Sequence, residues 1–380
     1  MQRRSGAAAC NLVNICGESF RDKTSGATLT CMWRLRAVRL AFPAAVLGLL
    51  LSTVLLAQSA PAPNTTGQAS PAIPLRPIAE LREQALKATP PVESGTFRKP
   101  LLVELVGGKE NPIHLDIHYA TANNFLGTPV YTEPRAFLQV PAAMALLRVA
   151  LRLEEQGYGL LIFDGYRPWY VTKIFWDATP PALHEYVANP AEGSRHNRGC
   201  AVDLTLYDLK SGQPVSMPSS YDEMTERAHS NYSGGTKQER KHREILREAM
   251  MREGFEPIPE EWWHYDYKEW REYPVLNLGF DVLPVIDGFA EGTTLPKILK
   301  RLEPEFTQEA REHKYQGEVR LEVVIREDGT PLVVAVLKGA KYGLTKAAIA
   351  SVQQWRFNPA TRDGKPVAIR TMMEVSFHLY

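Results

Sequence analysis

The chain contains Ser194-Arg195-His196-Asn197-Arg198-Gly199-Cys200-Ala201-Val202-Asp203, in which a histidine precedes an aspartate by seven positions, with a glycine between them. A second histidine, His264, stands further along the chain in Glu261-Trp262-Trp263-His264. Two histidines and one aspartate match the usual set of three protein ligands for catalytic zinc, which leaves one coordination position open for water. The sequence therefore predicts one zinc ion per chain, held by His196, Asp203 and His264.

Glu261 precedes the expected ligand His264 by three positions and is followed directly by two tryptophans. Apolar neighbours remove water from a carboxylate and raise its pKa towards the range where it exchanges protons at neutral pH. Zinc-assisted hydrolysis needs a group that accepts a proton from water and returns it to the leaving amine. We therefore expect Glu261 to be the general base, and we favour metal-dependent hydrolysis over a structural zinc site.

A predicted strand over residues 159–163 runs into the turn Asp164-Gly165-Tyr166-Arg167-Pro168. An arginine at a strand end beside a metal is suited to polarise a scissile carbonyl and to stabilise the oxyanion of the transition state. A surface salt bridge is the alternative for an isolated arginine. Because the turn follows a buried strand, we expect Arg167 to act in the site.

The amino-terminal part has the layout of an export signal. From Met32 the chain has positive residues, then an apolar run over residues 40–57, then small residues with a cleavage site near Ser59. This order is typical of a secretory signal peptide. We therefore expect translation to start at Met32 and residues 1–60 to be an N-terminal extension and signal peptide. An uncleaved inner-membrane anchor is the alternative, because the apolar run approaches the length of a spanning helix.

Composition places the remaining chain among globular proteins. Hydrophobic residues make up 44% and charged residues 23% of the 380 residues. The formal net charge of +1 argues against nucleic acid as the main partner. Cys200 is the one cysteine beyond the expected extension, so we expect no intramolecular disulfide in the mature chain. We interpret Cys200 as a small buried residue rather than a ligand.

The chain is expected to hold two folded domains joined by linkers. Residues 61–96 are rich in proline, alanine, serine and threonine, which predicts a flexible, extended linker with one short helix around 78–87. Residues 97–284 are expected to form the first domain and residues 285–295 a second linker. Residues 296–380 are expected to form a small carboxyl-terminal domain.

Hydrophobic patterning in the first domain predicts alternating strands and helices. Helices are expected over 141–156 and 237–252, and strands over 101–106, 113–119, 159–163, 201–206 and 263–267. The expected fold class is α+β, with an antiparallel sheet that bears the metal and helices packed behind it. His114, Asp116 and His118 alternate along one predicted strand, and we interpret them as a polar strand face rather than as metal ligands.

Patterning in the carboxyl-terminal domain predicts a second, smaller α+β unit of βαβ type. Its expected helices cover 299–311 and 344–355, and its expected strands cover 317–325, 331–337 and 368–379. Asp328-Gly329 predicts the turn of a hairpin. This domain shows no cluster of residues that indicates catalysis.

Several motifs resemble the D-alanyl-D-alanine dipeptidases, the zinc enzymes linked to vancomycin resistance. The resemblance covers about residues 101–280 and is carried by Asp164-Gly165-Tyr166-Arg167-Pro168, Ser194-x-His196-x-x-Gly199-x-Ala201-x-Asp203, Glu261-Trp262-Trp263-His264-Tyr265, Tyr119-Ala120-Thr121, Asn124-Phe125, Gly157-Tyr158-Gly159, Asp203-Leu204-Thr205-Leu206-Tyr207 and Glu226-Arg227.

The resemblance implies the roles already assigned to the two histidines, the aspartate, Glu261 and Arg167. It also implies that Ser194 contacts the substrate. It further implies that Asp222 receives the free ammonium of the dipeptide. An anionic anchor of this kind selects a dipeptide over a longer chain.

The carboxyl-terminal domain resembles the TonB carboxyl-terminal domain. The resemblance is carried by Gln316-Gly317-x-Val319, Asp328-Gly329, Ala347-Ala348, Gln354-Trp355-Arg356-Phe357-x-Pro359-Ala360 and Gly364-Lys365-Pro366-Val367. It implies a Gram-negative type envelope, a periplasmic location and docking to an envelope protein.

The expected function is zinc-dependent hydrolysis of D-alanyl-D-alanine in the periplasm. Two alternatives stay open. The same site can serve a peptidoglycan D,D-carboxypeptidase that acts on longer stem peptides. The chain can also be a non-catalytic, TonB-like envelope-binding protein, in which the first domain is a scaffold.

Overall fold

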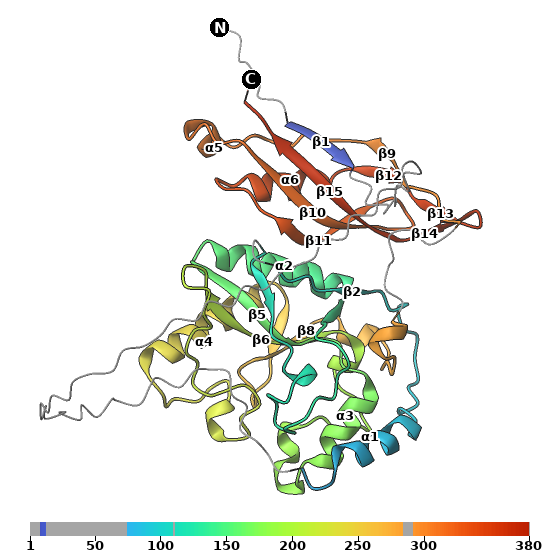
Figure 1. Cartoon of the computed structure of the whole chain (residues 1–380), viewed down its shortest axis with the longest axis vertical. Helices are drawn as coiled ribbons and strands as arrows, with labels where there is room; N and C mark the ends of the chain where they lie inside the picture. The colour runs from blue at the N-terminus through green and yellow to red at the C-terminus, as the bar shows by residue number, and fades with distance from the viewer. Residues whose placement is uncertain (1–7, 13–73, 109–110, 284–291, 380) are drawn as a thin grey trace, which may run out of the picture. The chain divides into compact units, whose positions relative to one another are not determined.

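The computed structural model describes residues 8–12, 74–108, 111–283 and 292–379 (Figure 1). The apolar run of the predicted signal peptide lies outside these residues. Among the helices that are described, none combines the length and the apolar character needed to cross a membrane.

The central sheet of the first half has five strands in the order β3-β5-β6-β8-β7. The strands are β3 Ile113–Leu115, β5 Tyr158–Asp164, β6 Ala201–Asp208, β7 Phe255–Pro257 and β8 His264–Tyr267. Neighbouring strands are antiparallel, except that β3 and β5 are parallel. The α+β class is therefore confirmed, but the sheet is mixed rather than fully antiparallel. A short antiparallel pair, β2 Leu102–Glu104 and β4 Phe137–Gln139, accompanies it.

Strands β5 and β6 form the buried centre of this sheet, because nearly all their residues are buried on both faces. Helix α2 (Val140–Glu154) packs against β5, and α4 (Lys237–Arg252) packs against β6 and β7. A capping box starts α4: the Thr236 hydroxyl accepts from the Glu239 backbone N–H, and the Glu239 carboxylate accepts from the Thr236 backbone N–H. Both helices match the sequence prediction closely.

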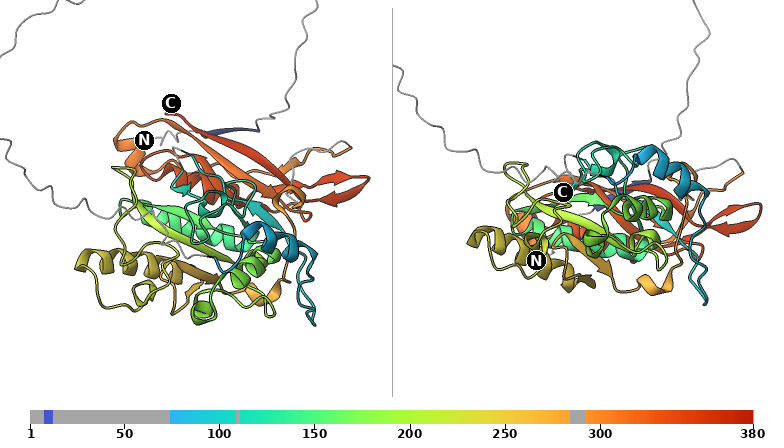
Figure 2. Two further views of the ribbon diagram at one scale, coloured as in Figure 1. Left: turned by 60° about the horizontal axis from the view of Figure 1, so that its bottom comes forward. Right: turned by 90° about the horizontal axis from the view of Figure 1, so that it is seen from below.

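Residues 74–96 do not behave as the flexible linker that composition suggests. They contain α1 (Ile78–Lys87), which lies beside α3 (Trp169–Ala178) in both Figure 1 and Figure 2. Leu81 and Ala85 on α1 are fully buried in the core of the first domain. The amphipathic spacing of this helix outweighs the proline- and alanine-rich composition around it, so the ordered region begins earlier than expected.

The connections carry short 3₁₀ helices. They are η1 His118–Ala120, η2 Pro181–Tyr186, η3 His196–Arg198, η4 Glu226–Ala228, η5 Trp270–Glu272 and η6 Phe280–Val282. The strand predicted over 113–119 is shorter than expected, because β3 stops at Leu115 and His118 falls in η1. The predicted alternation of His114, Asp116 and His118 along one strand is therefore wrong.

Three strands of the carboxyl-terminal half and one strand from the amino-terminal part of the chain, β1, form a four-stranded antiparallel sheet in the order β1-β15-β10-β11. Its strands are β1 Ala8–Leu12, β10 Gly317–Ile325, β11 Pro331–Lys338 and β15 Ile369–Phe377, and helix α6 covers Leu344–Val352. The predicted strands and hairpin turn are present. The βαβ-like expectation is met by β11, α6 and β15: both strands are antiparallel to β10, so they run parallel to each other on either side of it.

The segment expected to be a helix over 299–311 is mostly not helical. Its first residues belong to β9 (Lys297–Lys300), which pairs with β12 (Arg356–Asn358), and only α5 (Gln308–Glu312) is helical. A further hairpin joins β13 (Ala360–Arg362) to β14 (Lys365–Val367). Pairing with a strand distant in sequence decides the structure of this segment.

Candidate active site

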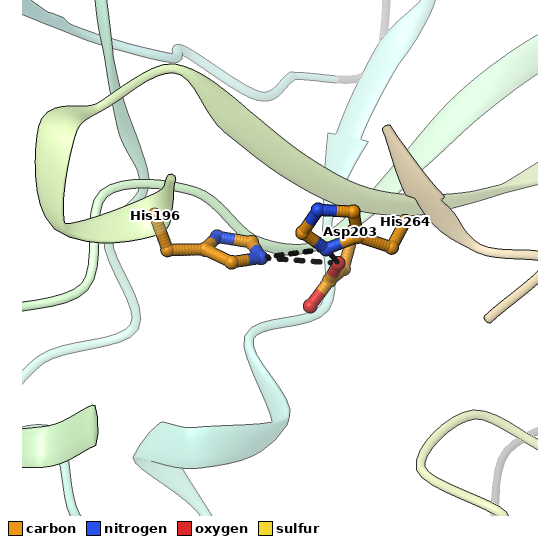
Figure 3. A group of neighbouring side chains, drawn as sticks. All are labelled: His196, Asp203 and His264. Atoms are coloured by element: carbon orange, nitrogen blue, oxygen red, sulfur yellow. Dashed lines mark hydrogen bonds and ion pairs between the residues drawn. The ribbon is translucent and has the colours of Figure 1, made fainter. Parts of the chain in front are cut away.

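The three predicted ligands come from one loop and two neighbouring strands. His196 opens η3, Asp203 lies on β6, and His264 is the first residue of β8. Strands β6 and β8 are antiparallel, and their register sets Asp203 opposite His264. The three side chains converge (Figure 3), and in the described part of the chain they form the only cluster with the composition of a metal site.

The spacing of the three ligand atoms fits a tetrahedral ion. His264 Nδ1 lies 3.1 Å from both His196 Nε2 and Asp203 Oδ1, and His196 Nε2 lies 3.3 Å from Asp203 Oδ1. Donors at about 2.0–2.1 Å from a tetrahedral zinc ion lie about 3.3–3.4 Å from one another. All three residues are buried. The donor set and its size therefore suit zinc.

Outer hydrogen bonds turn these three atoms towards one another. His196 Nδ1 lies 2.6 Å from the Gly165 carbonyl oxygen, which accepts a hydrogen bond from its N–H. His264 Nε2 lies 2.9 Å from Asp266 Oδ1. With a proton on each of these nitrogens, His196 Nε2 and His264 Nδ1 present lone pairs to the centre of the cluster. Partners of this kind fix the tautomer of ligand histidines.

The cluster is electrostatically prepared for a cation. Burial raises the pKa of Asp203, but the neighbouring His196 and His264 outweigh burial and hold that pKa well below its usual range. Burial lowers the pKa of His264, but Asp266 and Asp203 outweigh burial and raise that pKa to about 10. Both imidazoles thus face negative charge in a buried part of the site, which is an environment that favours a bound cation.

Glu261 lies beside the cluster. Its Oε2 is 3.7 Å from His264 Nδ1. Burial raises its pKa to about 8, against the opposing effect of His264. A carboxyl group with this pKa exchanges protons readily near neutral pH, as the sequence suggested for a glutamate among tryptophans.

Arg167 is held over the site by Asp164. The Arg167 Nε lies 2.9 Å from Asp164 Oδ2, and the Asp164 Oδ1 accepts a hydrogen bond from the Tyr131 hydroxyl. A nitrogen of Arg167 also lies 3.7 Å from Asp203 Oδ2, and its guanidinium carbon lies 4.6 Å from the centre of the Phe175 ring. The arginine is thus buried and fixed, which excludes the surface salt bridge considered from sequence.

Asp222 presents an unpaired carboxylate oxygen to the site. The Tyr119 hydroxyl donates to Asp222 Oδ1 at 2.9 Å, whereas Oδ2 is buried without a hydrogen-bond partner among the described residues. Burial, reinforced by Asp203, raises the pKa of Asp222 to about 7. Its backbone has φ of +57°, a conformation that is rare for a non-glycine residue and clusters at functional sites.

The loop that carries Ser194 and His196 is closed by Gly199. Gly199 has φ of +66°, and a side chain there would meet the Leu102 side chain at 2.4 Å. Within the loop the Ser194 hydroxyl oxygen accepts a hydrogen bond from the His196 backbone N–H at 3.2 Å. The glycine therefore lets the chain turn from η3 into β6, so that His196 and Asp203 face each other.

All seven predicted site residues line one cavity of about 350 Å³. They are Arg167, Ser194, His196, Asp203, Asp222, Glu261 and His264. A volume near the lower end of the range for small-molecule pockets, about 300–1,000 Å³, suits a small ligand. The structure thus brings together the residues whose roles were predicted separately.

The residues that were set aside stay outside the metal cluster. His114 stacks on Tyr207, and Cys200 is buried in the core. His118 is buried and lies 3.1 Å from Asp116 through its Nε2. Five supporting residues escaped the sequence analysis as members of the site: Tyr119, Tyr131, Asp164, Tyr221 and Asp266.

Two family models match the chain in separate parts. Residues 108–274 match the family described as D-ala-D-ala dipeptidase, and residues 303–379 match Gram-negative bacterial TonB protein C-terminal. A D-alanyl-D-alanine dipeptidase of Enterococcus faecium is 38% identical over 198 residues, which cover 47% of this chain and 95% of the relative. A relative with the same name from Escherichia coli K12 is 34% identical over 164 residues, which cover 43% of this chain and 83% of the relative.

The fold, the buried cluster and these matches define a peptidase with a candidate metal centre. More closely, the chain belongs to the D-alanyl-D-alanine dipeptidase family. Its carboxyl-terminal part carries a TonB-type domain, which suggests association with the cell envelope.

Proposed function

We propose that the chain hydrolyses the D-alanyl-D-alanine dipeptide in the cell envelope with one zinc ion on His196, Asp203 and His264. The observation that supports this most strongly is the small cavity where these three residues meet Glu261 and Asp222. A small pocket with an acidic anchor suits a short peptide with a free ammonium group better than a long polymer.

Each step of the proposed hydrolysis is assigned to a particular group in the site. Zinc, when bound, would act as a Lewis acid that lowers the pKa of a water molecule, so that this water can lose a proton and attack a peptide carbonyl near neutral pH. Glu261 accepts the proton of the attacking water and delivers it to the nitrogen of the leaving D-alanine. Arg167, fixed by Asp164, donates hydrogen bonds to the oxyanion as negative charge develops on it.

Replacement of Arg167 by lysine is expected to lower kcat by about 10²–10³-fold with little change in KM, because the lysine lacks the planar fork that Asp164 orients. Steady-state kinetics on D-Ala-D-Ala measure this loss. Zinc content, determined on the same sample, should stay at one ion per chain. A change confined to KM would show that Arg167 binds the ground state and does not stabilise the transition state.

Asp222 is proposed to receive the substrate ammonium through its unpaired Oδ2, with Tyr119 holding the other oxygen. Asp222→Asn should raise KM for D-Ala-D-Ala about 10- to 100-fold, the usual effect of losing a charge-assisted hydrogen bond. N-acetyl-D-Ala-D-Ala, which has no ammonium, is the matched substrate, and its slower hydrolysis should be unaffected. Equal losses on both substrates would refute the ammonium role.

Ser194 is proposed as a further substrate contact, since it is buried at the cavity wall directly before Arg195 and His196. The proposed division of the chain keeps the peptidase within residues 97–284, with α1 packed onto it, and the TonB-type domain within 296–380. Export by the signal in residues 1–60 would deliver the enzyme to the periplasm. There the second domain would dock to an envelope protein.

Substrate profiling of the zinc-loaded full chain tests the function. D-Ala should be released from free D-Ala-D-Ala, and a chelator should stop its release. Cleavage of a pentapeptide that ends in D-Ala-D-Ala, without cleavage of the dipeptide, would instead identify a D,D-carboxypeptidase. Absence of both activities, together with failure to bind zinc, would leave the non-catalytic binding protein as the explanation.

A further inference from the structure

The cavity is rich in carboxylates and has few cations. The arginines among its lining residues are Arg167 and Arg195. Arg167 is already paired with Asp164 and lies near Asp203. Arg195 is therefore the cation that the proposed mechanism leaves unused.

Arg195 is held in a defined position at the cavity. Its Nε lies 3.3 Å from Asp266 Oδ2, and its guanidinium carbon lies 4.8 Å from the centre of the Trp270 ring. No hydrogen bond from a described residue engages its two terminal nitrogens, and its side chain is 45% exposed. The guanidinium is thus stacked and anchored at one nitrogen, with the fork of terminal N–H groups available to a ligand.

The position of Arg195 in the chain also ties it to the reaction centre. It stands between Ser194 and His196, both of which line the same cavity. Its partner Asp266 accepts the hydrogen bond from His264. Any ligand group that reaches Arg195 therefore lies next to the metal cluster.

A free dipeptide carries two charges that must be recognised when it leaves water. Asp222 accounts for the ammonium, but the terminal carboxylate would face an acidic cavity without a partner. The planar guanidinium fork matches a carboxylate in shape and charge, and it pairs with both oxygens. An unpaired carboxylate beside Glu260 and Glu261 would instead be repelled.

We propose that Arg195 binds the terminal carboxylate of the substrate and makes the site selective for a free carboxyl end. This inference rests on the proposed dipeptidase function and adds a specificity-determining residue to it. Asp266 and Trp270 hold the guanidinium in place before the substrate arrives, so little ordering is needed on binding.

The test compares two substrates, D-Ala-D-Ala and its terminal amide, on the zinc-loaded full chain. The wild-type chain should prefer the free acid. Arg195→Gln should lower kcat/KM for the acid about tenfold, mainly through KM, and should change the amide less than about twofold. Arg195→Lys keeps the positive charge but lacks the planar fork of N–H groups. Its kcat/KM for the acid should lie between the values of the wild-type chain and of Arg195→Gln.

Zinc content and circular dichroism show whether either variant has lost the site or the fold. Equal losses on both substrates, or loss of zinc in both variants, would show that Arg195 only supports Asp266, and would overturn the proposal. A wild-type chain that hydrolyses acid and amide equally well would overturn it too, while leaving the dipeptidase function intact. A chain that hydrolyses neither would overturn both.

Discussion

Glu261→Gln is expected to lower kcat for D-Ala-D-Ala hydrolysis by about 10²–10⁴-fold while one zinc ion per chain is retained. The amide has nearly the shape of the carboxylate but cannot accept the proton of water, so the contribution of general base catalysis is lost. Glu261 is no zinc ligand in the proposed site, and its Oε2 lies 3.7 Å from His264 Nδ1. Steady-state kinetics combined with metal analysis measure both effects.

Glu256→Gln is the matched control for this variant. Glu256 is an exposed residue of β7, in the strand that precedes the Glu261 loop, and it does not line the cavity. Its replacement should leave both kcat and zinc content unchanged. If Glu261→Gln keeps more than about a tenth of the wild-type kcat, another group serves as the base.

The centre of the fold was predictable because its signals are local. The apolar residues of β5 and β6 and the amphipathic spacing of α4 place these elements nearly at their observed bounds. The segment that contains Leu299 was not predictable, because β9 forms only by pairing with β12, far along the chain. The antiparallel return of β15 onto β10 likewise depends on contacts between distant residues.

The same difference between local signals and long-range contacts decides which residues of the candidate site could be predicted. The motif spacing pointed to His196, Asp203 and His264, and the structure brings them together because β6 and β8 are neighbours. Asp266 has a signal that was overlooked: on a strand, residues two positions apart share a face, so Asp266 lies on the side of His264. Tyr221 has no such signal, because its hydrogen bond to Asp203 depends on how a long loop folds back.

Removal of a ligand and removal of its outer partner should weaken zinc binding to different degrees. His264→Ala deletes one of three donors and is expected to abolish both tight zinc binding and hydrolysis. Asp266→Asn keeps all three donors but changes the group that orients His264 through its Nε2. Zinc affinity should then fall about 10- to 100-fold, with activity recovering when zinc is added in excess.

Competition with a chromophoric chelator measures both affinities, and His114→Ala provides the control. His114 stacks on Tyr207 and lies outside the metal cluster, so its loss should leave zinc affinity unchanged. His264→Ala leaves Asp266 buried without its histidine partner and leaves Asp203 with only one of its two. Asp266→Asn is therefore the variant that separates metal binding from folding. If Asp266→Asn binds zinc as tightly as the wild type, the hydrogen bond between Asp266 and His264 does not orient His264 as a ligand. The proposed role of Asp266 in zinc binding would then be wrong.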